Sequence, residues 1–464
     1  MKNKFIAYTL FSFLLIGISC TEKDTIPQDI EIQNFIWKAM NLNYLWLEEI
    51  PDLQDNRFKN QDELNAYLQG KTPENLFESL LYSGDRFSWI TDDYIALENS
   101  FQGLSKTTGM RFGLVRTAAD SDIIFGYVRY VLPNSSADLE GVQRGDIFYA
   151  VNNTPLTVAN YYNLLFNENE TITFDYADFS MANNQVILTP NNIHKTLVKE
   201  VLQENPIHTV AIKEIQGHKI GYLLYNQFAS SFDTNLNQIF GQFKTENITD
   251  LVLDLRYNGG GSVNTAVILS SMITGQFTNE LFASEEYNYK LQPFYEDHTK
   301  LYFTDKLTNG QAINSLQLNK LYVIVSGSTA SASELVIQGL NPYIDVVLIG
   351  TKTVGKSVAS VTLYDSDNYR REGANPNHMY AIQPIVLEIK NKLGQNNHTG
   401  LLPNILQGEN FADLGELGNE NETLFASAID VILNTRRMQR TNKILPLIDD
   451  NQIKETKNNM YVTF

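Results

Sequence analysis

Three short apolar runs, residues 251–255, 321–325 and 344–349, constrain the fold of this 464-residue chain more than any other feature. Each run has the length and composition of a buried strand and ends in a turn of small or polar residues. Residues 233–243 and 262–273 beside them have helical patterns. Strands that alternate with helices predict an α/β region, with the turns gathered at one rim of a sheet.

The turns after the second and third runs contain a nucleophile and a base. Residues 329–334 read Thr-Ala-Ser-Ala-Ser-Glu, and residues 355–356 read Gly-Lys. A turn of small residues between a strand and a helix presents a hydroxyl without steric crowding. Lys356 lies 25 residues after Ser331, which leaves room for one helix and one strand. Both side chains are therefore predicted to meet at one rim as a nucleophile–base pair.

The turn after the first run, residues 256–261, reads Arg-Tyr-Asn-Gly-Gly-Gly. Glycines between a strand end and a helix start leave backbone N–H groups pointing outward, as a developing oxyanion requires. A phosphate-binding loop is the alternative, because glycine loops at helix N-termini also bind anions. Neither Gly-Lys-Ser/Thr nor Gly-x-Gly-x-x-Gly is present, which favours the oxyanion interpretation.

Other chemistries have little support in the sequence. There is no Gly-x-Ser-x-Gly, Ser-x-x-Lys or His-Glu-x-x-His motif. The six histidines are scattered without metal-ligand spacing, so we expect no metal and no organic cofactor. His378 and His398 are interpreted as surface or structural residues rather than as a base for Ser331. The formal net charge of −18 argues against a nucleic-acid partner, because phosphate binding needs clustered Lys and Arg.

Residues 1–19 have the pattern of an export signal. Lys2 and Lys4 precede an apolar run over residues 5–18, which is short for a membrane span. We therefore expect an exported protein in the cell envelope, in the periplasm or at the outer membrane.

Cys20 follows this run and is the only cysteine, which excludes an intramolecular disulfide. Its position resembles the acylated cysteine of bacterial lipoproteins, although Gly17 stands where that pattern favours leucine. The resemblance implies a lipid anchor on Cys20 that tethers the chain to a membrane, followed by a linker over residues 20–28. A plain secretory signal with an incidental cysteine is the alternative.

Short strands and glycine turns dominate residues 101–190, after a helical pattern over residues 29–100. The series Pro133…Ser136-Ala137…Gly141…Gly145-Asp146-Ile147…Val151-Asn152 resembles a PDZ domain. In such domains a peptide adds a strand to a sheet edge, and a loop receives its terminal carboxylate. The resemblance places that loop near Arg111, Phe112, Gly113 and Leu114. Ligand binding or gating is favoured over a role as a packed linker.

The three turns, taken in order, resemble the C-terminal processing (tail-specific) proteases. The matching motifs are Asp254-Leu255-Arg256-x-Asn258-x-Gly260-Gly261, residues 329–334 and Gly355-Lys356, with Gly-Leu-Leu-Pro-Asn at 400–404. The resemblance covers about residues 29–435 and implies an α/β multidomain fold. Its parts are a helical N-terminal domain (29–100), a PDZ-like β-rich domain (101–190) and an α/β peptidase domain of the crotonase-like, ClpP type (206–435). An irregular C-terminal tail (436–464) follows.

This family uses a Ser–Lys dyad, and the resemblance assigns its parts by position. Ser331 becomes the nucleophile and Lys356 the general base, while the N–H groups of Ala332 and of Gly260 or Gly261 form the oxyanion hole. Some members orient the lysine with a glutamine four residues later. Ser360 occupies that position here, so Ser360 and Glu334 are the candidate orienting groups.

A lysine that acts as a base must be neutral. The usual lysine pKa near 10.4 has to fall by roughly 3 units, about 4 kcal/mol, which burial supplies. Val354, Val358 and Val361 are apolar, and no carboxylate occurs between residues 351 and 363. We therefore predict a buried, neutral Lys356 within hydrogen-bond reach of Ser331.

The sequence thus predicts a lipid-anchored serine endopeptidase that hydrolyses protein substrates through an acyl-enzyme. The PDZ-like domain is expected to recognise or gate substrate C-termini and to offer a site for a regulatory partner. The opposing hypothesis is a catalytically silent lipoprotein that binds peptides through the PDZ groove.

Overall fold

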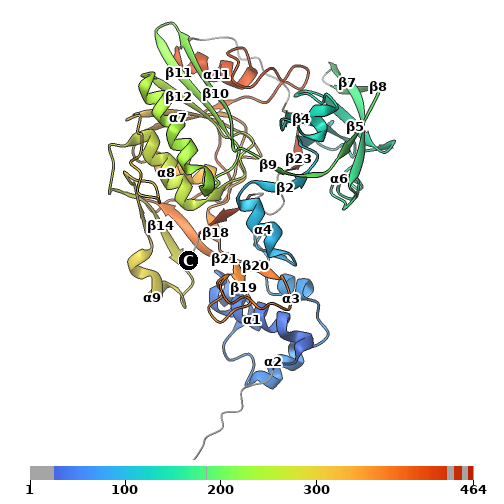
Figure 1. The fold of residues 1–464 in the computed structure, drawn as a ribbon, viewed down its shortest axis with the longest axis vertical. Coiled ribbons are helices and arrows are strands. Elements are labelled where there is room, and N and C mark those ends of the chain that lie inside the picture. The colour runs from blue at the N-terminus through green and yellow to red at the C-terminus, as the bar shows by residue number, and fades with distance from the viewer. Residues whose placement is uncertain (1–25, 184, 436–443, 452–457, 463–464) are drawn as a thin grey trace, which may run out of the picture.

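The computed structural model describes residues 26–183, 185–435, 444–451 and 458–462 (Figure 1). The predicted export signal and Cys20 lie outside the described residues. Among the residues described, no helix has the length and apolar character needed to cross a bilayer. The architecture is mixed α/β with a helical N-terminal region and β-rich parts, so the predicted fold class is confirmed.

The N-terminal region is helical and lies at one end of the molecule (Figure 1). Ile36, Ala39 and Met40 of its first long helix are all fully buried. Asn60 and Thr72 cap the second and third helices by accepting backbone N–H groups. The elements are η1 (Gln28–Ile30), α1 (Glu31–Asn43), η2 (Leu47–Glu49), η3 (Pro51–Leu53), α2 (Gln61–Leu68), α3 (Pro73–Ser79) and α4 (Tyr94–Phe101). Between α3 and α4, β1 (Trp89–Thr91) pairs with β20 (Ala381–Gln383), which also pairs with β19 (Leu363–Tyr364).

A β-rich region follows, and the chain enters and leaves it through one antiparallel ribbon. The ribbon consists of β2 (Leu104–Thr107) and β9 (Glu200–Gln203). The region's sheet has the order β23-β3-β4-β5-β7-β8, with β6 paired to β5. Its elements are β3 (Met110–Arg116), β4 (Ile124–Val131), α5 (Ser136–Leu139), β5 (Ile147–Val151), β6 (Thr154–Pro155), α6 (Tyr161–Leu165), β7 (Thr171–Ala182) and β8 (Gln185–Val198). The edge strand β23 (Leu447–Asp450) comes from the far end of the sequence.

The α/β region is built on a six-stranded sheet in the order β10-β11-β12-β16-β17-β22, parallel from β11 onward. Leu251 and Leu253 of β12 pack with α7 and α8, whereas Val252 packs with α11 on the opposite face. Alternate residues of the strand thus face opposite sides of the sheet, and helices cover both sides. The elements are β10 (Ile207–Ile215), β11 (His218–Tyr225), η4 (Ser230–Phe232), α7 (Asp233–Thr245), β12 (Asp250–Asp254), α8 (Val263–Thr274), β16 (Lys320–Val325), α10 (Ala332–Leu340), β17 (Asp345–Gly350), β22 (Ile405–Leu406) and α11 (Thr423–Ile432).

A second six-stranded sheet in the order β13-β24-β18-β21-β14-β15 completes the region. Helix α10 contacts β17 of the first sheet and β14 and β21 of the second, so it lies between the two sheets. The elements are β13 (Gly261–Ser262), β14 (Leu281–Tyr287), α9 (Gln292–Tyr295), η5 (Glu296–His298), β15 (Lys300–Tyr302), β18 (Val358–Ser360), β21 (Ile385–Asn391) and β24 (Met460–Tyr461).

The expectation of an irregular C-terminal tail is wrong where the structure describes that part of the chain. Residues 447–450 form β23 on the sheet of the β-rich region, and residues 460–461 form β24 inside the second sheet. Backbone groups in these short stretches pair with strands distant in sequence. Stretches of four and two residues carry no strand pattern that a sequence reading detects.

Candidate active site

The three predicted turns lie side by side at the carboxyl ends of β12, β16 and β17, which are neighbours in the parallel sheet. The Ala330 N–H donates to the Asn258 carbonyl over 3.1 Å, and the Val354 N–H donates to the Thr329 carbonyl over 3.0 Å. The hydroxyl of Thr329 also donates to the Leu255 carbonyl. The turns therefore form one hydrogen-bonded unit.

Ser331 occupies the last position before α10, with φ of 69° and ψ of −120°. A positive φ is uncommon for a residue with a Cβ, and strain of this kind is concentrated at functional sites. The side chain is fully buried, and Oγ has no hydrogen-bond partner among the described residues. A buried hydroxyl normally finds a partner, so an unpaired one in a strained turn indicates a functional role.

Lys356 is only 2 % exposed. Its Nζ lies 4.9 Å from the centroid of the Phe87 ring, and no carboxylate of the described residues forms an ion pair with it. Burial lowers the pKa of Lys356 to about 7, against the opposing charges of Asp85 and Glu334. At neutral pH a large fraction of this amine is unprotonated.

Ser331 and Lys356 do not hydrogen-bond to each other in the described structure, because Ser331 Oγ has no partner. The predicted direct contact is therefore absent here. Lys356 lines a cavity of about 220 Å³ that Asn459 also lines. The Asn459 carbonyl oxygen and Ser331 Oγ lie 2.5 Å and 2.8 Å from the position that a Cβ on Gly260 would take. Asn459 thus adjoins both residues.

Glu334 links the backbone of the Ser331 turn to the backbone of the Lys356 turn. Its Oε2 accepts the N–H groups of Ser331 and Lys356, both over 2.9 Å, and its Oε1 accepts the N–H of Gly355 over 2.8 Å. The Thr353 hydroxyl donates to the same carboxylate. Burial raises the pKa of Glu334, while these hydrogen bonds act in the opposite direction. Glu334 therefore positions the two turns through their backbones and does not contact the lysine amine.

The candidate oxyanion donors differ in their present partners. The Gly260 N–H donates to Asn258 Oδ1 over 2.8 Å, and the Gly261 N–H donates to the Asn459 carbonyl over 2.6 Å. Ala332 is the first residue of α10, so its N–H has no carbonyl acceptor within the helix. Of the three predicted donors, Gly261 and Ala332 have N–H groups suited to a carbonyl oxygen at Ser331, whereas the Asn258 side chain occupies that of Gly260.

Ser360 contacts the C-terminal part of the chain instead of the lysine. Its Oγ lies 2.7 Å from Gln383 Oε1, 3.0 Å from Asn459 Oδ1 and 3.2 Å from the Met460 carbonyl oxygen. The orienting hydrogen bond expected between Ser360 and Lys356 is not seen among the described contacts. Sequence reasoning placed Asn258 in the motif of the glycine turn without a role for its side chain, and it missed Asn459, since a lone asparagine carries no motif.

The predicted carboxylate-binding loop at Arg111, Phe112, Gly113 and Leu114 is wrong as a loop, because all four residues lie in the middle of β3. The edge of β3 is already paired with β23, with Gly113 opposite Asp450. The Phe112 N–H donates to Asn451 Oδ1 over 2.7 Å. The extended strand continues through these residues, so the glycine makes no turn there.

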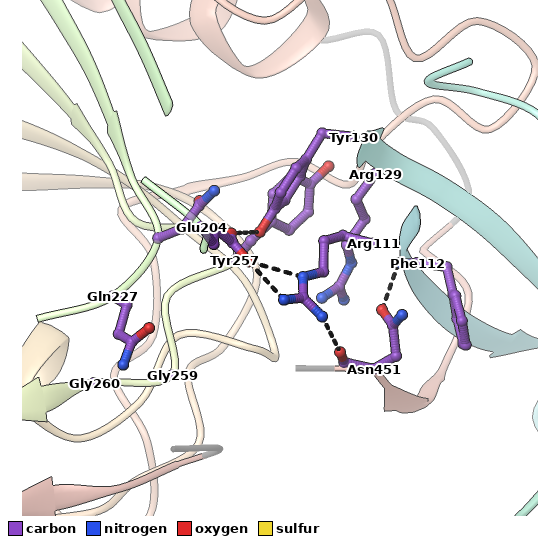
Figure 2. Close-up of a pocket in the computed structure, with 11 residues that line it drawn as sticks. Arg111, Phe112, Arg129, Tyr130, Glu204, Gln227, Tyr257, Gly259, Gly260 and Asn451 are labelled. Carbon is purple, nitrogen blue, oxygen red and sulfur yellow. Dashed lines mark hydrogen bonds and ion pairs between the residues drawn. The ribbon is translucent and has the colours of Figure 1, made fainter. Parts of the chain in front are cut away.

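A pocket separates β3 and β4 from the glycine turn (Figure 2). Figure 2 shows Arg111, Glu204 and Tyr130 pointing toward one another, and the Arg111–Glu204 ion pair measures 2.7 Å. Arg129 pairs with Asp450 over 2.9 Å and donates to Ser328 Oγ over 2.8 Å. A polar network therefore joins the β-rich region to the turn that contains Ser331.

Arg256 forms the other buried charged cluster near the glycine turn. It is fully buried and pairs with Asp254 at 2.7 Å, Glu422 at 2.8 Å and Glu409 at 3.3 Å. Burial opposes the charge, but the carboxylates outweigh it and hold the pKa of Arg256 well above its usual value. These contacts make Asp254 and Arg256 structural supports of the glycine turn. The described residues contain no group of three or more His, Cys, Asp or Glu side chains arranged to hold a metal.

Two family models match the chain. The model described as peptidase family S41 covers residues 219–369, and the peptidase S41 N-terminal domain covers residues 31–89. A carboxyl-terminal-processing protease of Picosynechococcus sp. is 23% identical over 51% of this chain and 50% of that protein. A probable CtpA-like serine protease of Staphylococcus epidermidis is 24% identical over 36% of this chain and 31% of that protein. The chain spans half or less of the length of these curated relatives.

Solved structures resemble the chain over most of its length. A putative S41 protease from Bacteroides fragilis has a TM-score of 0.67 and 26% identity, covering 87% of this chain and 98% of that one. The photosystem II D1 C-terminal processing protease has a TM-score of 0.50 and 18% identity, covering 86% and 98%. The second likeness concerns the fold alone.

Proposed function

The chain belongs to peptidase family S41, and on this premise we propose that it is a serine-type endopeptidase that hydrolyses protein substrates through an acyl-enzyme. In this proposal Ser331 Oγ attacks the scissile carbonyl carbon. Lys356 Nζ accepts the proton of the hydroxyl and then donates it to the leaving amine. The N–H groups of Gly261 and Ala332 stabilise the oxyanion. A water molecule then hydrolyses the ester and restores Ser331.

The observation that carries the proposal is the state of Lys356. A buried lysine without an ion-pair partner among the described residues is unfavourable for stability, and burial lowers its pKa to about 7. A general base works best when its pKa lies near the working pH. The unpaired, strained hydroxyl of Ser331 at the same rim of the sheet supports the same assignment.

The dyad needs a movement of its side chains to form the Ser331–Lys356 contact, because the two side chains do not hydrogen-bond here. In free enzymes catalytic hydrogen bonds are often long and tighten only with substrate. Glu334 is proposed as the positioning residue, since its carboxylate accepts the backbone N–H groups of both catalytic residues. It constrains the turns through their backbones and leaves the lysine amine without a hydrogen bond to Glu334.

Residues 101–190 are proposed as a PDZ-like domain that recognises or gates substrate C-termini, with a regulatory partner at the same surface. The export pattern before Cys20 supports a protein anchored in the cell envelope by a lipid on that cysteine.

The test uses an unfolded protein such as reduced casein as substrate, with fragments followed by mass spectrometry. Ser331→Ala is expected to lower kcat/KM by about 10³-fold or more, because no other group forms the acyl-enzyme. Ser333→Ala is the matched control: it removes the neighbouring buried hydroxyl, whose partner is the Asn258 carbonyl. That variant should retain measurable turnover.

The second candidate is a catalytically silent peptide-binding protein, which the pairing of β23 with β3 supports, because it shows that this edge accepts an added strand. Residues 458–462 lie beside Ser331, so a chain that ends at Lys457 must be assayed as well. Absence of cleavage by both the wild-type and the shortened chain would favour the binding protein over the peptidase.

A further inference from the structure

Residues 458–462 pass directly beside the candidate nucleophile. Within this segment β24 lies between β13 and β18, and its pairing is parallel to both. Met460 is opposite Gly261, and Tyr461 is opposite both Ser262 and Ser360. The segment is therefore an extended strand inserted between two edges that would otherwise be open.

The Asn459 carbonyl has the contacts expected of the carbonyl of a bound substrate. Its oxygen accepts the Gly261 N–H over 2.6 Å. A Cβ on Gly260 would lie 2.5 Å from this oxygen and 2.6 Å from Ser331 Cβ, so the two groups flank the same backbone atom. A carbonyl oxygen on an oxyanion donor beside the nucleophile is the arrangement that precedes acyl transfer.

The side chains of the segment are held on both sides of this carbonyl. Asn459 Oδ1 lies 3.0 Å from Ser360 Oγ, and the Val462 N–H donates to the Ser360 carbonyl over 3.1 Å. Met460 is 1% exposed and belongs to the main apolar core. The Tyr461 ring stacks on Phe101 with centroids 4.3 Å apart. Main-chain pairing together with side-chain pockets is the way an extended peptide is recognised at a sheet edge.

We propose that the cleft between β13 and β18 is the substrate-binding site and that residues 458–462 occupy it in the register of a bound peptide. The proposal rests on the peptidase function and names its substrate class. That class is an extended peptide with a small polar residue on the acyl side and an apolar residue on the leaving side. Ser360, the residue at the position of the family's glutamine, recognises the polar side chain.

Occupation of the cleft holds the chain in an inhibited state. Ser331 and Lys356 are both buried while the segment is in place, so a second peptide has no route to the hydroxyl. The edge of β3, the proposed peptide-binding edge of the PDZ-like domain, is filled by β23 from the same part of the chain. Both edges must be vacated before an external peptide binds in these registers.

The experiment measures binding in a Ser331→Ala background, so the readout does not depend on turnover. The probe is a fluorescein-labelled peptide with the sequence of residues 457–464, Lys-Asn-Asn-Met-Tyr-Val-Thr-Phe, followed by fluorescence anisotropy. We expect a Ser331→Ala chain that ends at Lys457 to bind it at least tenfold more tightly than the full Ser331→Ala chain. Equal affinity of the two chains, or no binding by the folded shortened chain, would overturn the proposal.

A full-length variant tests the same displacement without shortening the chain, so misfolding of the shortened chain cannot explain the result. Met460→Glu places a charge where the side chain is buried, so the segment leaves the cleft. Met379→Glu makes the same change at a position that is 47% exposed and serves as the matched control. Each is combined with Ser331→Ala for the binding assay. Met460→Glu should bind the probe at least tenfold more tightly than Met379→Glu, and equal affinities would count against the proposal.

The same two variants with Ser331 intact distinguish a failure of the cleft assignment from a failure of the peptidase function. Met460→Glu should cleave unfolded protein at least tenfold faster than Met379→Glu. If the probe binds as expected but neither variant cleaves, the peptidase function fails while the cleft assignment stands. If Met460→Glu and Met379→Glu cleave at the same rate, the peptidase function stands and the inhibitory role of residues 458–462 is refuted.

Discussion

Arg256 and Lys356 are two buried cations at the same rim of the central sheet, and they are held in opposite ways. Arg256 lies just after β12 and Lys356 lies between β17 and β18. Three carboxylates pair with the guanidinium, whereas no carboxylate of the described residues pairs with the amine. Burial thus accompanies a pKa well above the usual value at Arg256 and one of about 7 at Lys356.

The difference teaches that burial alone does not decide whether a cation stays charged. The decisive quantity is the number of opposite charges buried with it, because an isolated ion loses its hydration without compensation. The Arg256 cluster suits a permanent support for the glycine turn. The Lys356 pocket suits a group that exchanges a proton near neutral pH.

The largest effect is expected when the amine is replaced by a cation that cannot lose its proton. Lys356→Arg should lower kcat/KM by about 10⁴-fold or more, roughly 5.5 kcal/mol, because a guanidinium stays protonated and cannot accept the serine proton. The assay is cleavage of an unfolded protein, with the melting temperature measured to confirm folding. Near-normal proteolysis would refute the dyad.

Removal of the paired cation should destabilise the fold. Arg256→Met leaves Asp254 and Glu422 buried without their ion-pair partner, whereas Glu409 keeps Arg144, and the loss costs about 3–5 kcal/mol in the free energy of unfolding. Arg371→Met is the control, since the side chain of Arg371 is 44% exposed and its pair with Glu98 contributes about 0–1 kcal/mol. Urea unfolding of both variants measures the difference, and equal losses would contradict the assigned role of the cluster.

Removal of the unpaired amine of Lys356 should instead raise the free energy of unfolding. The folded pKa of Lys356 is about 7. Its unfolded value is near 10.4, so the unfolded chain binds more protons between these limits and stability rises with pH across them. The cost of burial is therefore fully present below pH 7. Lys356→Met should raise the free energy of unfolding by roughly 2–4 kcal/mol at pH 6.

This gain should fade as the pH approaches 10, because the unfolded lysine then loses its proton as well. Urea unfolding at pH 6 and pH 10 tests the dependence. A stability gain that is the same at both pH values would show that the amine is not neutral in the folded chain.

The smallest effect concerns the pH dependence of cleavage when Lys356 is intact. Protonated Lys356 cannot act as a base, so kcat/KM should fall about tenfold for each pH unit below about 7 and level off above it. The Met460→Glu chain is suited to this assay, since its cleft is expected to be open. Activity that stays constant down to pH 5 would be inconsistent with Lys356 as the base.

The sequence predicts the rim of the sheet well and the partners of the rim residues poorly. The turns at Gly260, Ser331 and Lys356 were expected side by side because each follows a buried run, and parallel strands bring their ends together. The burial of Lys356 was expected from its apolar neighbours. The roles of Asn258 and Glu334 depend on hydrogen bonds to backbone groups, and such bonds leave no pattern in the sequence.

The errors arose where the contact joins positions far apart in the chain. The PDZ resemblance placed a loop near residues 111–114, but pairing with residues 447–450 keeps them extended. Ser360 was compared with a glutamine beside the lysine, whereas its contacts are Gln383, Asn459 and Met460. Local propensity does not reveal such distant pairing.

The β2–β9 ribbon has a consequence for the evolution of this architecture. Thr107 and Glu200 are opposite each other in the ribbon, so everything between them enters and leaves at adjacent points. The ribbon brings the two ends of this module together, while β23 and the Arg129–Ser328 hydrogen bond tie the module to the rest of the chain. A module exchanged at this junction would therefore have to supply a new edge for β23 and a new partner for Ser328.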